Sequence, residues 1–136
     1  MKLSRTVDYA VRATLQLAKS ETPDPVPCSR LAASGQMPER FLLQILRNLV
    51  THGILRSTRG VDGGYALVKP ADQISLLEVI EAIEGPYETN GENMSAESLE
   101  QLRTALDEVT QSTRGQLEAI KLSHLIPPPK LVAKVR

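Results

Sequence analysis

Aromatic residues are nearly absent from this sequence. Its 136 residues include no Trp, one Phe and three Tyr, although 41% of the residues are hydrophobic. The core must therefore be aliphatic, built from Leu, Ile, Val and Ala side chains. A chain of this length can bury one such core, and it has room for little more than one domain and an appended helix.

Cysteine, long apolar runs and catalytic patterns are also scarce. A single cysteine, Cys28, excludes a disulfide within the chain and a metal site built from cysteine alone. No apolar run approaches the roughly 18 residues that span a bilayer, and the N-terminus MKLSRTVDYA has no signal-peptide core. We therefore predict a cytoplasmic protein without a membrane partner. There is no phosphate loop, Ser-His-Asp order or inward carboxylate pair, and His52 and His124 lack metal-ligand spacing. We expect neither an enzyme nor a bound metal or cofactor.

The net charge is zero, with 16 basic and 16 acidic residues, but the two signs are separated along the chain. Residues 1–70 hold ten Lys and Arg against five Asp and Glu, whereas residues 71–136 hold six against eleven. The first half is therefore a candidate anion-binding module, and the second half is not.

Helix signals in the first half predict a helix-turn-helix. The segment from Leu3 to Lys19 is amphipathic, and the proline-rich run TPDPVP separates it from a short helix over 29–34. A longer helix follows, with Pro38 in its first turn and Gly53 as a left-handed cap. Its predicted buried stripe comprises Phe41, Leu42, Ile45, Leu46 and Leu49. A short helix, a turn containing glycine and a longer helix match a helix-turn-helix.

The outer face of the longer helix carries side chains that can reach base edges and phosphates. The predicted DNA-contacting residues on it are Pro38, Glu39, Arg40, Leu43, Gln44 and Arg47, with Asn48 on the same face. The alternative is an ordinary solvated helix face.

A glycine-rich hairpin is predicted directly after this helix. The runs 54–58 and 65–68 alternate or nearly alternate, and RGVDGGY joins them. Gly60, Gly63 and Gly64 permit positive φ and let the backbone approach a surface, so Arg59 would project from a slim wing toward the minor groove or its phosphates. The alternative is a tight hairpin with an incidental surface arginine. We interpret Tyr65 as covering the core below the wing.

The second half predicts a capped core helix and a long interface helix. Ser75 and Glu78 form a capping box, and Gly85-Pro86 ends that helix. Another helix begins near Ser95 or Ser98 and carries a heptad seam for a partner helix, with Gln116 or Leu117 filling a gap. The seam residues are Leu99, Leu102, Leu106, Val109, Thr113 and Ile120. The alternative is that this helix folds back on its own domain.

The strings MKLSRTVDYAVRATLQLA, FLLQILRNLVTHGILRSTRG, GGYALVKP and ISLLEVIEAIEGP stand in this order within residues 1–86. With them the chain resembles the IscR, NsrR and CymR family of winged-helix transcriptional regulators. The resemblance implies a mainly helical fold with a small β-hairpin wing and a long C-terminal dimerisation helix. It also implies a homodimer on a dyad-symmetric operator of double-stranded DNA. The expected parts are a DNA-binding domain over 1–86, a loop and dimerisation helix over 87–126, and a flexible tail over 127–136.

The chain departs from that family at its sensor. Many members ligate an iron-sulfur cluster with three cysteines between the capped helix and the long helix, where this chain reads PYETNGENMSAE. We therefore expect no cluster, and we interpret Asp8, which matches a cluster-ligating carboxylate in the nitric-oxide-sensing branch, as a solvent-facing charge. Leu43 occupies the place of a glutamate that tunes operator choice in the iron-sulfur regulator. Cys28 is either a thiol activated by a helix N-terminus for redox sensing or a small buried hydrophobe.

These observations favour a sequence-specific transcriptional regulator, a repressor, that responds to an unknown small-molecule effector in the crevice between the long helix and the winged domain, or to a partner protein. The alternative is a dimeric winged-helix adaptor that has lost DNA binding. Asp62 at the wing tip and the neutral net charge support that alternative.

Overall fold

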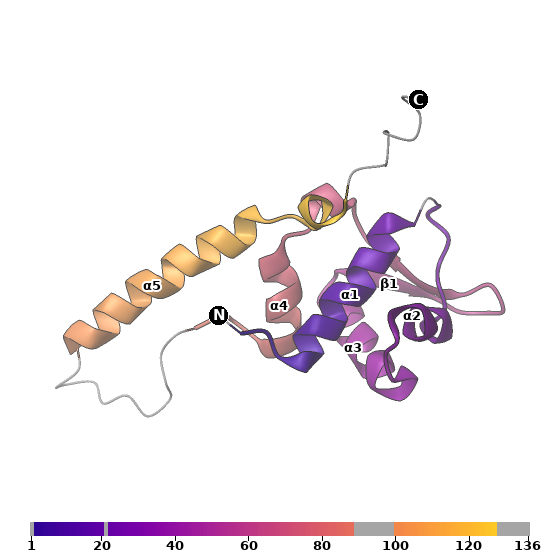
Figure 1. Cartoon of the computed structure of the whole chain (residues 1–136), viewed down its shortest axis with the longest axis horizontal. Helices are drawn as coiled ribbons and strands as arrows, with labels where there is room; N and C mark the ends of the chain where they lie inside the picture. The colour runs from indigo at the N-terminus through magenta and orange to yellow at the C-terminus, as the bar shows by residue number, and fades with distance from the viewer. Residues whose placement is uncertain (1, 21, 89–99, 128–136) are drawn as a thin grey trace, which may run out of the picture.

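The computed structural model describes residues 2–20, 22–88 and 100–127 (Figure 1). The described residues form helices α1 (Arg5–Lys19), α2 (Cys28–Gly35) and α3 (Glu39–Thr51), strands β1 (Leu55–Thr58) and β2 (Gly64–Leu67), and helices α4 (Leu76–Glu84) and α5 (Glu100–Ala119). Two 3-10 turns, η1 (Ala71–Gln73) and η2 (Leu122–Leu125), complete the order. The predicted fold class, mainly helical with a small hairpin and a long C-terminal helix, is confirmed.

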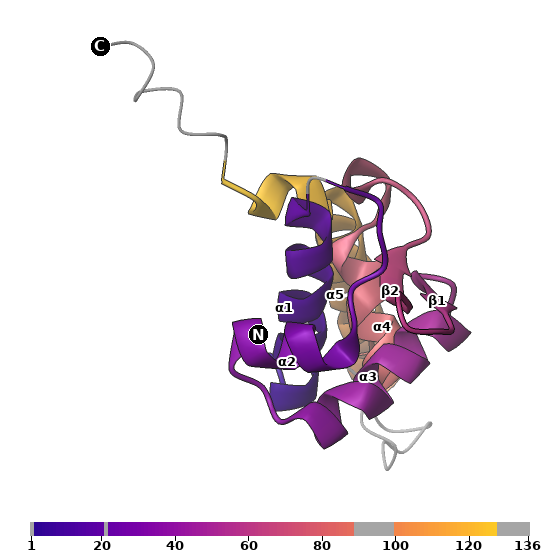
Figure 2. The ribbon, with the colours of Figure 1, turned by 90° about the vertical axis from the view of Figure 1, so that its right-hand side faces the viewer.

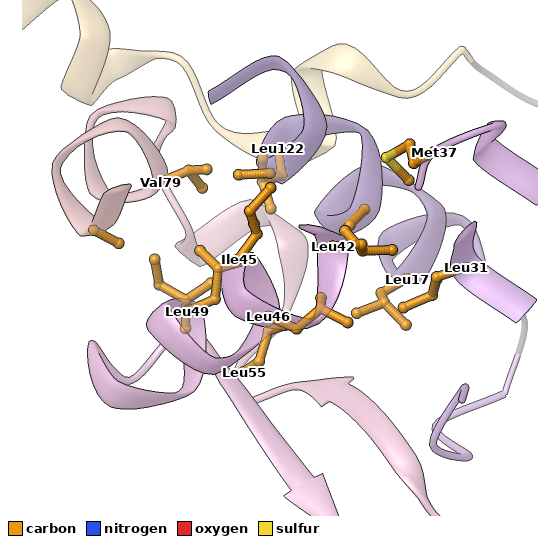
Figure 3. Packing of buried hydrophobic residues seen from close by; sticks show 14 of the residues in the cluster. Leu17, Leu31, Met37, Leu42, Ile45, Leu46, Leu49, Leu55, Val79 and Leu122 are labelled. Atoms are coloured by element: carbon orange, nitrogen blue, oxygen red, sulfur yellow. The ribbon is translucent and has the colours of Figure 1, made fainter. Parts of the chain in front are cut away.

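Helix α3 lies at the centre of an aliphatic core. Its buried residues are Leu42, Ile45, Leu46 and Leu49, each at most 1% exposed. Figure 3 shows them meeting side chains from α1, α2, β1, α4 and η2, among them Leu17, Leu31, Leu55, Val79 and Leu122. Burial of this many aliphatic side chains is the main stabilising contribution to the domain.

The predicted stripe was wrong about Phe41, which is 39% exposed. Each helical residue turns by about 100°, so position 41 lies at the edge of the stripe that 42, 45, 46 and 49 define. The ring instead meets Tyr9 of α1 edge-on, with 5.6 Å between the ring centroids. The Arg12 guanidinium lies over the Tyr9 ring, 5.6 Å from its centroid. This aromatic contact ties α1 to the first turn of α3 at the surface.

The hairpin continues directly from α3. Gly53 takes the predicted left-handed conformation, with φ +77°, and the Ile54 amide donates to the Leu49 carbonyl over 2.9 Å. Strands β1 and β2 pair antiparallel from Leu55 opposite Leu67 to Thr58 opposite Gly64. The α1–α2 connection adds a third backbone segment, because Val26 and Tyr65 exchange two hydrogen bonds of 2.9 Å. The base of the wing is therefore held on both sides.

The capping box predicted for α4 is confirmed. The Glu78 amide donates to the Ser75 hydroxyl over 3.1 Å, and the Ser75 amide donates to the Glu78 carboxylate over 3.0 Å. Helix α5 packs on α4 through its C-terminal half, where Leu117 joins Val7, Leu77 and Ile80 in a second apolar cluster. Its N-terminal half projects away from the domain (Figure 1).

The long helix ends one residue before the prediction. We placed Ile120 on the helix, but α5 stops at Ala119. The Ile120 carbonyl accepts from the Leu76 amide over 2.8 Å, and the Leu122 amide donates to the Ile74 carbonyl over 2.9 Å. This pairing pulls the chain out of the helix and buries Leu122 completely in the main core. The predicted start near Ser95 or Ser98 lies outside the described residues, as do Leu99 and the tail from 128 onward.

Candidate nucleic-acid interface

Helices α2 and α3 and the hairpin lie on one side of the molecule, away from η2 (Figure 2). The α2–α3 turn is closed by the Met37 amide, which donates to the Ala32 carbonyl over 2.9 Å. The left-handed residue of the turn is Gln36, with φ +57°, and not the preceding glycine. Pro38 is also one position earlier than predicted: it is the N-cap of α3, with extended backbone, and not a first-turn residue. The helix-turn-helix itself is present.

The outward face of α3 presents the predicted side chains to solvent. Glu39, Arg40, Gln44 and Arg47 are exposed, and Leu43 is partly exposed. Positions 40, 44 and 47 follow the four-then-three spacing that places side chains on one helix face. The exposed set is therefore a continuous strip of one amide and two guanidinium groups, with a leucine beside it.

The wing presents Arg59 from a short glycine loop. Its turn is closed by the Gly63 amide, which donates to the Gly60 carbonyl over 3.0 Å. Gly60 has φ +109° and Gly64 has φ +148°, backbone values that favour glycine. A Cβ at position 63 would collide with the Thr58 carbonyl, and one at position 64 would collide with the backbone of Val26. These two glycines therefore serve the close internal packing of the wing, in addition to any approach to an outside surface.

The cations of this face have no protein counter-ion among the described residues. The ion pairs found among the described residues join Arg12 to Asp8 over 3.0 Å, Lys69 to Glu78 over 3.4 Å, and Arg114 to Glu81. Arg40, Arg47 and Arg59 take part in none of them. A guanidinium that is already exposed and unpaired keeps its charge available for a phosphate.

The sequence prediction omits one cation beside the wing. Arg30 is exposed on α2. It lines a cavity of about 420 Å³ together with Asp24 of the α1–α2 connection and with Val61 and Asp62 of the wing loop. The sequence signal for it is weak, because the short helix has too few residues to show which of its faces turns outward. Its place next to the wing adds a fourth unpaired guanidinium to the candidate interface.

Cys28 stands at the first position of α2 and is partly buried. Burial raises the pKa of its thiol, and the Glu39 carboxylate adds to the rise. The Sγ atom lies 3.7 Å from the Glu39 carbonyl, to which it donates. The surroundings therefore keep the thiol protonated, which agrees with the interpretation as a small hydrophobe and not with an activated thiolate.

The residues of the predicted dimer seam differ in their exposure. Leu102 and Val109 are 47% and 51% exposed, Leu106 and Thr113 are partly buried, and Leu117 faces α4. Leu117 therefore does not fill the gap in the seam, and Gln116 is exposed at that place. The two large exposed apolar side chains lie seven residues apart on the projecting half of α5, on one side of the helix.

The residues present do not fit an iron-sulfur cluster. The 136 residues contain one cysteine, and it lies in α2. Asp8 pairs with Arg12 and is partly exposed, as predicted for a surface charge. Among residues 2–20, 22–88 and 100–127 no three His, Cys, Asp or Glu side chains come together in a way that holds a metal ion. Iron-sulfur clusters need thiolates that this chain lacks.

A cavity of about 500 Å³ lies beside the long helix, but residues 86–88, and not the body of the winged domain, form its other wall. It lies between α5 and the segment after α4, and its lining includes Tyr87, Gln111 and Arg114. The Glu81 carboxylate accepts from both Arg114 and the Tyr87 amide. The Arg114 guanidinium in this cavity therefore has its counter-ion within the protein. None of the helices in the described part of the chain has the length and apolar character needed to cross a bilayer.

Comparison with known proteins gives one family. The sequence model of the Rrf2 family, described as iron-dependent transcriptional regulator, matches residues 3–128. The HTH-type transcriptional regulator CymR of Bacillus subtilis is 30% identical over 118 residues, which cover 83% of this chain and 86% of CymR. A Mycobacterium tuberculosis protein named as an HTH-type transcriptional regulator is 43% identical over 86 residues, 63% of this chain and 53% of that protein. The chain thus spans about half the length of that relative.

Solved structures show the same fold. CymR of B. subtilis superimposes with a TM-score of 0.74 at 24% identity, covering 92% of this chain and 95% of CymR. IscR of T. potens gives a TM-score of 0.71 at 23% identity, covering 100% of this chain and 89% of IscR. The oxidized form of Staphylococcus aureus CymR gives 0.70 at 28% identity, covering 92% of this chain and 95% of that one.

Proposed function

Because the chain belongs to the Rrf2 family of transcriptional regulators, we propose that it is a homodimeric, sequence-specific DNA-binding protein that represses transcription. One observation carries the proposal: the outward face of α3 and the adjoining wing present unpaired guanidinium groups on one side of the molecule. Phosphate contacts by such groups supply most of the affinity of a protein for DNA.

In the proposed complex α3 lies in the major groove. Arg40, Gln44 and Arg47 face base edges and phosphates, and Leu43 contacts a thymine methyl group, because an alkyl side chain offers no hydrogen bond to any base. Arg59 and the glycines Gly60, Gly63 and Gly64 bring the wing to the minor groove or its phosphates. The proposal is thus a two-groove contact with base readout concentrated in α3.

The proposed dimer forms through the projecting half of α5. Leu102 and Val109 are exposed in the single chain, and a partner α5 would cover them. Leu99, Leu106, Thr113 and Ile120 belong to the proposed interface as the sequence predicts it. A two-fold dimer places the two α3 helices in successive major grooves, so the half-sites should lie about 34 Å apart or a multiple of that distance. Residues 1–86 then serve as the DNA-binding part and 87–126 as the dimerisation part.

The proposed protein works in the cytoplasm without an iron-sulfur cluster and without enzymatic activity. Two observations support the lack of a cluster. The chain has one cysteine, and no three potential metal ligands come together among the described residues. The signal must then come from a small molecule or a partner protein. A bound dimer represses by occupying DNA that polymerase needs.

The test is fluorescence anisotropy with a labelled duplex from the promoter of the protein's own gene, followed by footprinting. We expect a protected region with two-fold sequence symmetry, and weaker binding for Arg40→Ala and Arg47→Ala. Lys19→Ala is the matched control, since it removes one exposed charge at the far end of α1 (Figure 2). Deletion of the gene should raise transcription from that promoter. If both α3 variants bind the duplex as tightly as the wild type does, the alternative of an adaptor without specific DNA binding is favoured.

A further inference from the structure

A cavity lies between the base of the wing and the α1–α2 connection. Its volume is about 390 Å³, within the range of small-molecule sites. It is lined by the C-terminal end of α1, residues 20 and 22–24 of the connection, β1, β2 and the segment 68–71. Both views show the connection running beside the hairpin (Figures 1 and 2). The cavity is thus separate from the outward face of α3 and from the crevice beside α5.

The cavity holds two charges of opposite sign that have no partner in the described structure. Arg56 and Asp24 both line it, yet neither lies within ion-pair distance of the other or of any other described residue. Lys69 also lines the cavity, but its ammonium lies 3.4 Å from the Glu78 carboxylate. The available cation is therefore Arg56 and the available anion is Asp24. Two opposite charges that line one cavity without pairing are both available to a ligand.

The floor of the same cavity is apolar. Leu17 and Ala66 are 7% and 8% exposed, so their remaining accessible atoms face this space, and Leu67 and Ala71 extend the apolar surface. An apolar floor below a few placed polar groups is the usual composition of a small-molecule site. The ligand that fits must have one negative charge, one positive charge and a short apolar part.

We propose that this cavity binds a free amino acid with an apolar side chain. The α-carboxylate pairs with Arg56, whose planar guanidinium suits two carboxylate oxygens. The α-ammonium pairs with Asp24 on the opposite wall. The side chain lies on Leu17 and Ala66. A simple anion would satisfy only Arg56 and would meet repulsion from Asp24, so both charges of the ligand are needed.

The site joins two elements that determine where the wing stands. Strand β2 supplies Ala66 and Leu67 to the floor, and its residue Tyr65 pairs with Val26 of the connection that forms the opposite wall. A ligand held by Arg56 and Asp24 fixes the hairpin relative to that connection, and so alters the population of wing positions. This regulatory consequence rests on the proposed DNA-binding function, whereas binding of the amino acid does not.

The test is isothermal titration calorimetry of the full chain without DNA, with L-leucine, L-valine and L-methionine titrated singly. We expect saturable binding of at least one of them at concentrations up to about 10 mM. Arg56→Gln and Asp24→Asn should each weaken that binding about tenfold or more, because each removes one charge-assisted contact. Lys2→Ala is the matched control and should bind as the wild type does, because Lys2 is exposed before the start of α1 whereas the cavity lies at the C-terminal end of that helix.

Two analogues separate the charges. For leucine, 4-methylpentanoic acid lacks the ammonium and 3-methylbutylamine lacks the carboxylate, and we expect both to bind about tenfold or more weakly. The penalty for the amine should vanish in Arg56→Gln, which a merely structural role of Arg56 would not produce. Failure of all three amino acids to bind, or equal binding of the carboxylic acid, overturns the proposal. Failure of DNA binding with intact calorimetry would overturn the proposed function and leave this site standing.

Discussion

Replacement of the wing arginine, Arg59→Ala, tests the contribution of the wing to the proposed interface. Arg59 is exposed, has no ion-pair partner among the described residues and precedes the glycine turn of the wing. Its removal therefore leaves the fold of the domain intact. The loss should appear in the ionic part of DNA binding, since a wing cation contacts phosphates or the negative potential of the minor groove.

The magnitude follows from counterion release. Each neutralised phosphate contributes about 0.9 to the slope of log affinity against log salt. A dimer carries two copies of Arg59, so the slope of the variant should be shallower by about 1.8. Between about 50 and 200 mM salt the wild type should then lose about twelvefold more affinity than the variant.

The assay is anisotropy of the promoter duplex at four or more salt concentrations in that range, with circular dichroism to verify the fold of the variant. Lys19→Ala also removes one exposed positive charge, at the C-terminal end of α1, and should keep the slope of the wild type. An Arg59→Ala slope equal to that of the wild type, with equal affinity, would show that the wing makes no ionic contact with DNA.

Four further outcomes are expected. Val109→Lys should weaken dimer formation at least about hundredfold, because two copies of an exposed seam residue lose their apolar contact; a stable dimer in light scattering at low concentration would refute the seam. Gly64→Ala should destabilise the domain by about 1–3 kcal/mol through a strained φ and a collision with Val26, and an unchanged denaturant midpoint would contradict this. Leu49→Ala should cost about 2–5 kcal/mol in the same measurement. Because the pKa of the Cys28 thiol is raised, its alkylation at neutral pH should be slower than that of an unfolded control and should accelerate as the pH rises. The raised pKa also means that the protonated thiol favours the folded state, so this contribution to stability is lost at alkaline pH.

The parts of the fold that were predictable from sequence are those with local signals. The α3 stripe, the Ser75 and Glu78 capping box and the glycine-rich hairpin each depend on residues within a few positions of one another. Such patterns determine helix and turn geometry through nearby hydrogen bonds and periodicity. The predicted cations of the candidate interface follow from the same periodicity, because an exposed face is the complement of a buried stripe.

Contacts between distant segments were not predictable in this way. Leu122 is fully buried against the core, but its place depends on hydrogen bonding to Ile74, far away in the sequence. The pairing of Val26 with Tyr65 arises in a proline-rich run that carries no strand signal. That pairing holds the connection, which carries Asp24, beside the hairpin, which carries Arg56, and both residues line the 390 Å³ cavity.

The wing glycines show how a correct pattern can have a different physical cause. We expected Gly63 and Gly64 to free the wing tip for approach to DNA, but the structure places Thr58 and Val26 where their side chains would be. The wing is therefore held at its base by β1 on one side and by the α1–α2 connection on the other. A cation presented from such a base loses little conformational freedom when it binds, so more of its ionic interaction appears as affinity. The same packing makes the position of Arg59 depend on the α1–α2 connection, and any ligand that fixes this connection acts directly on the wing.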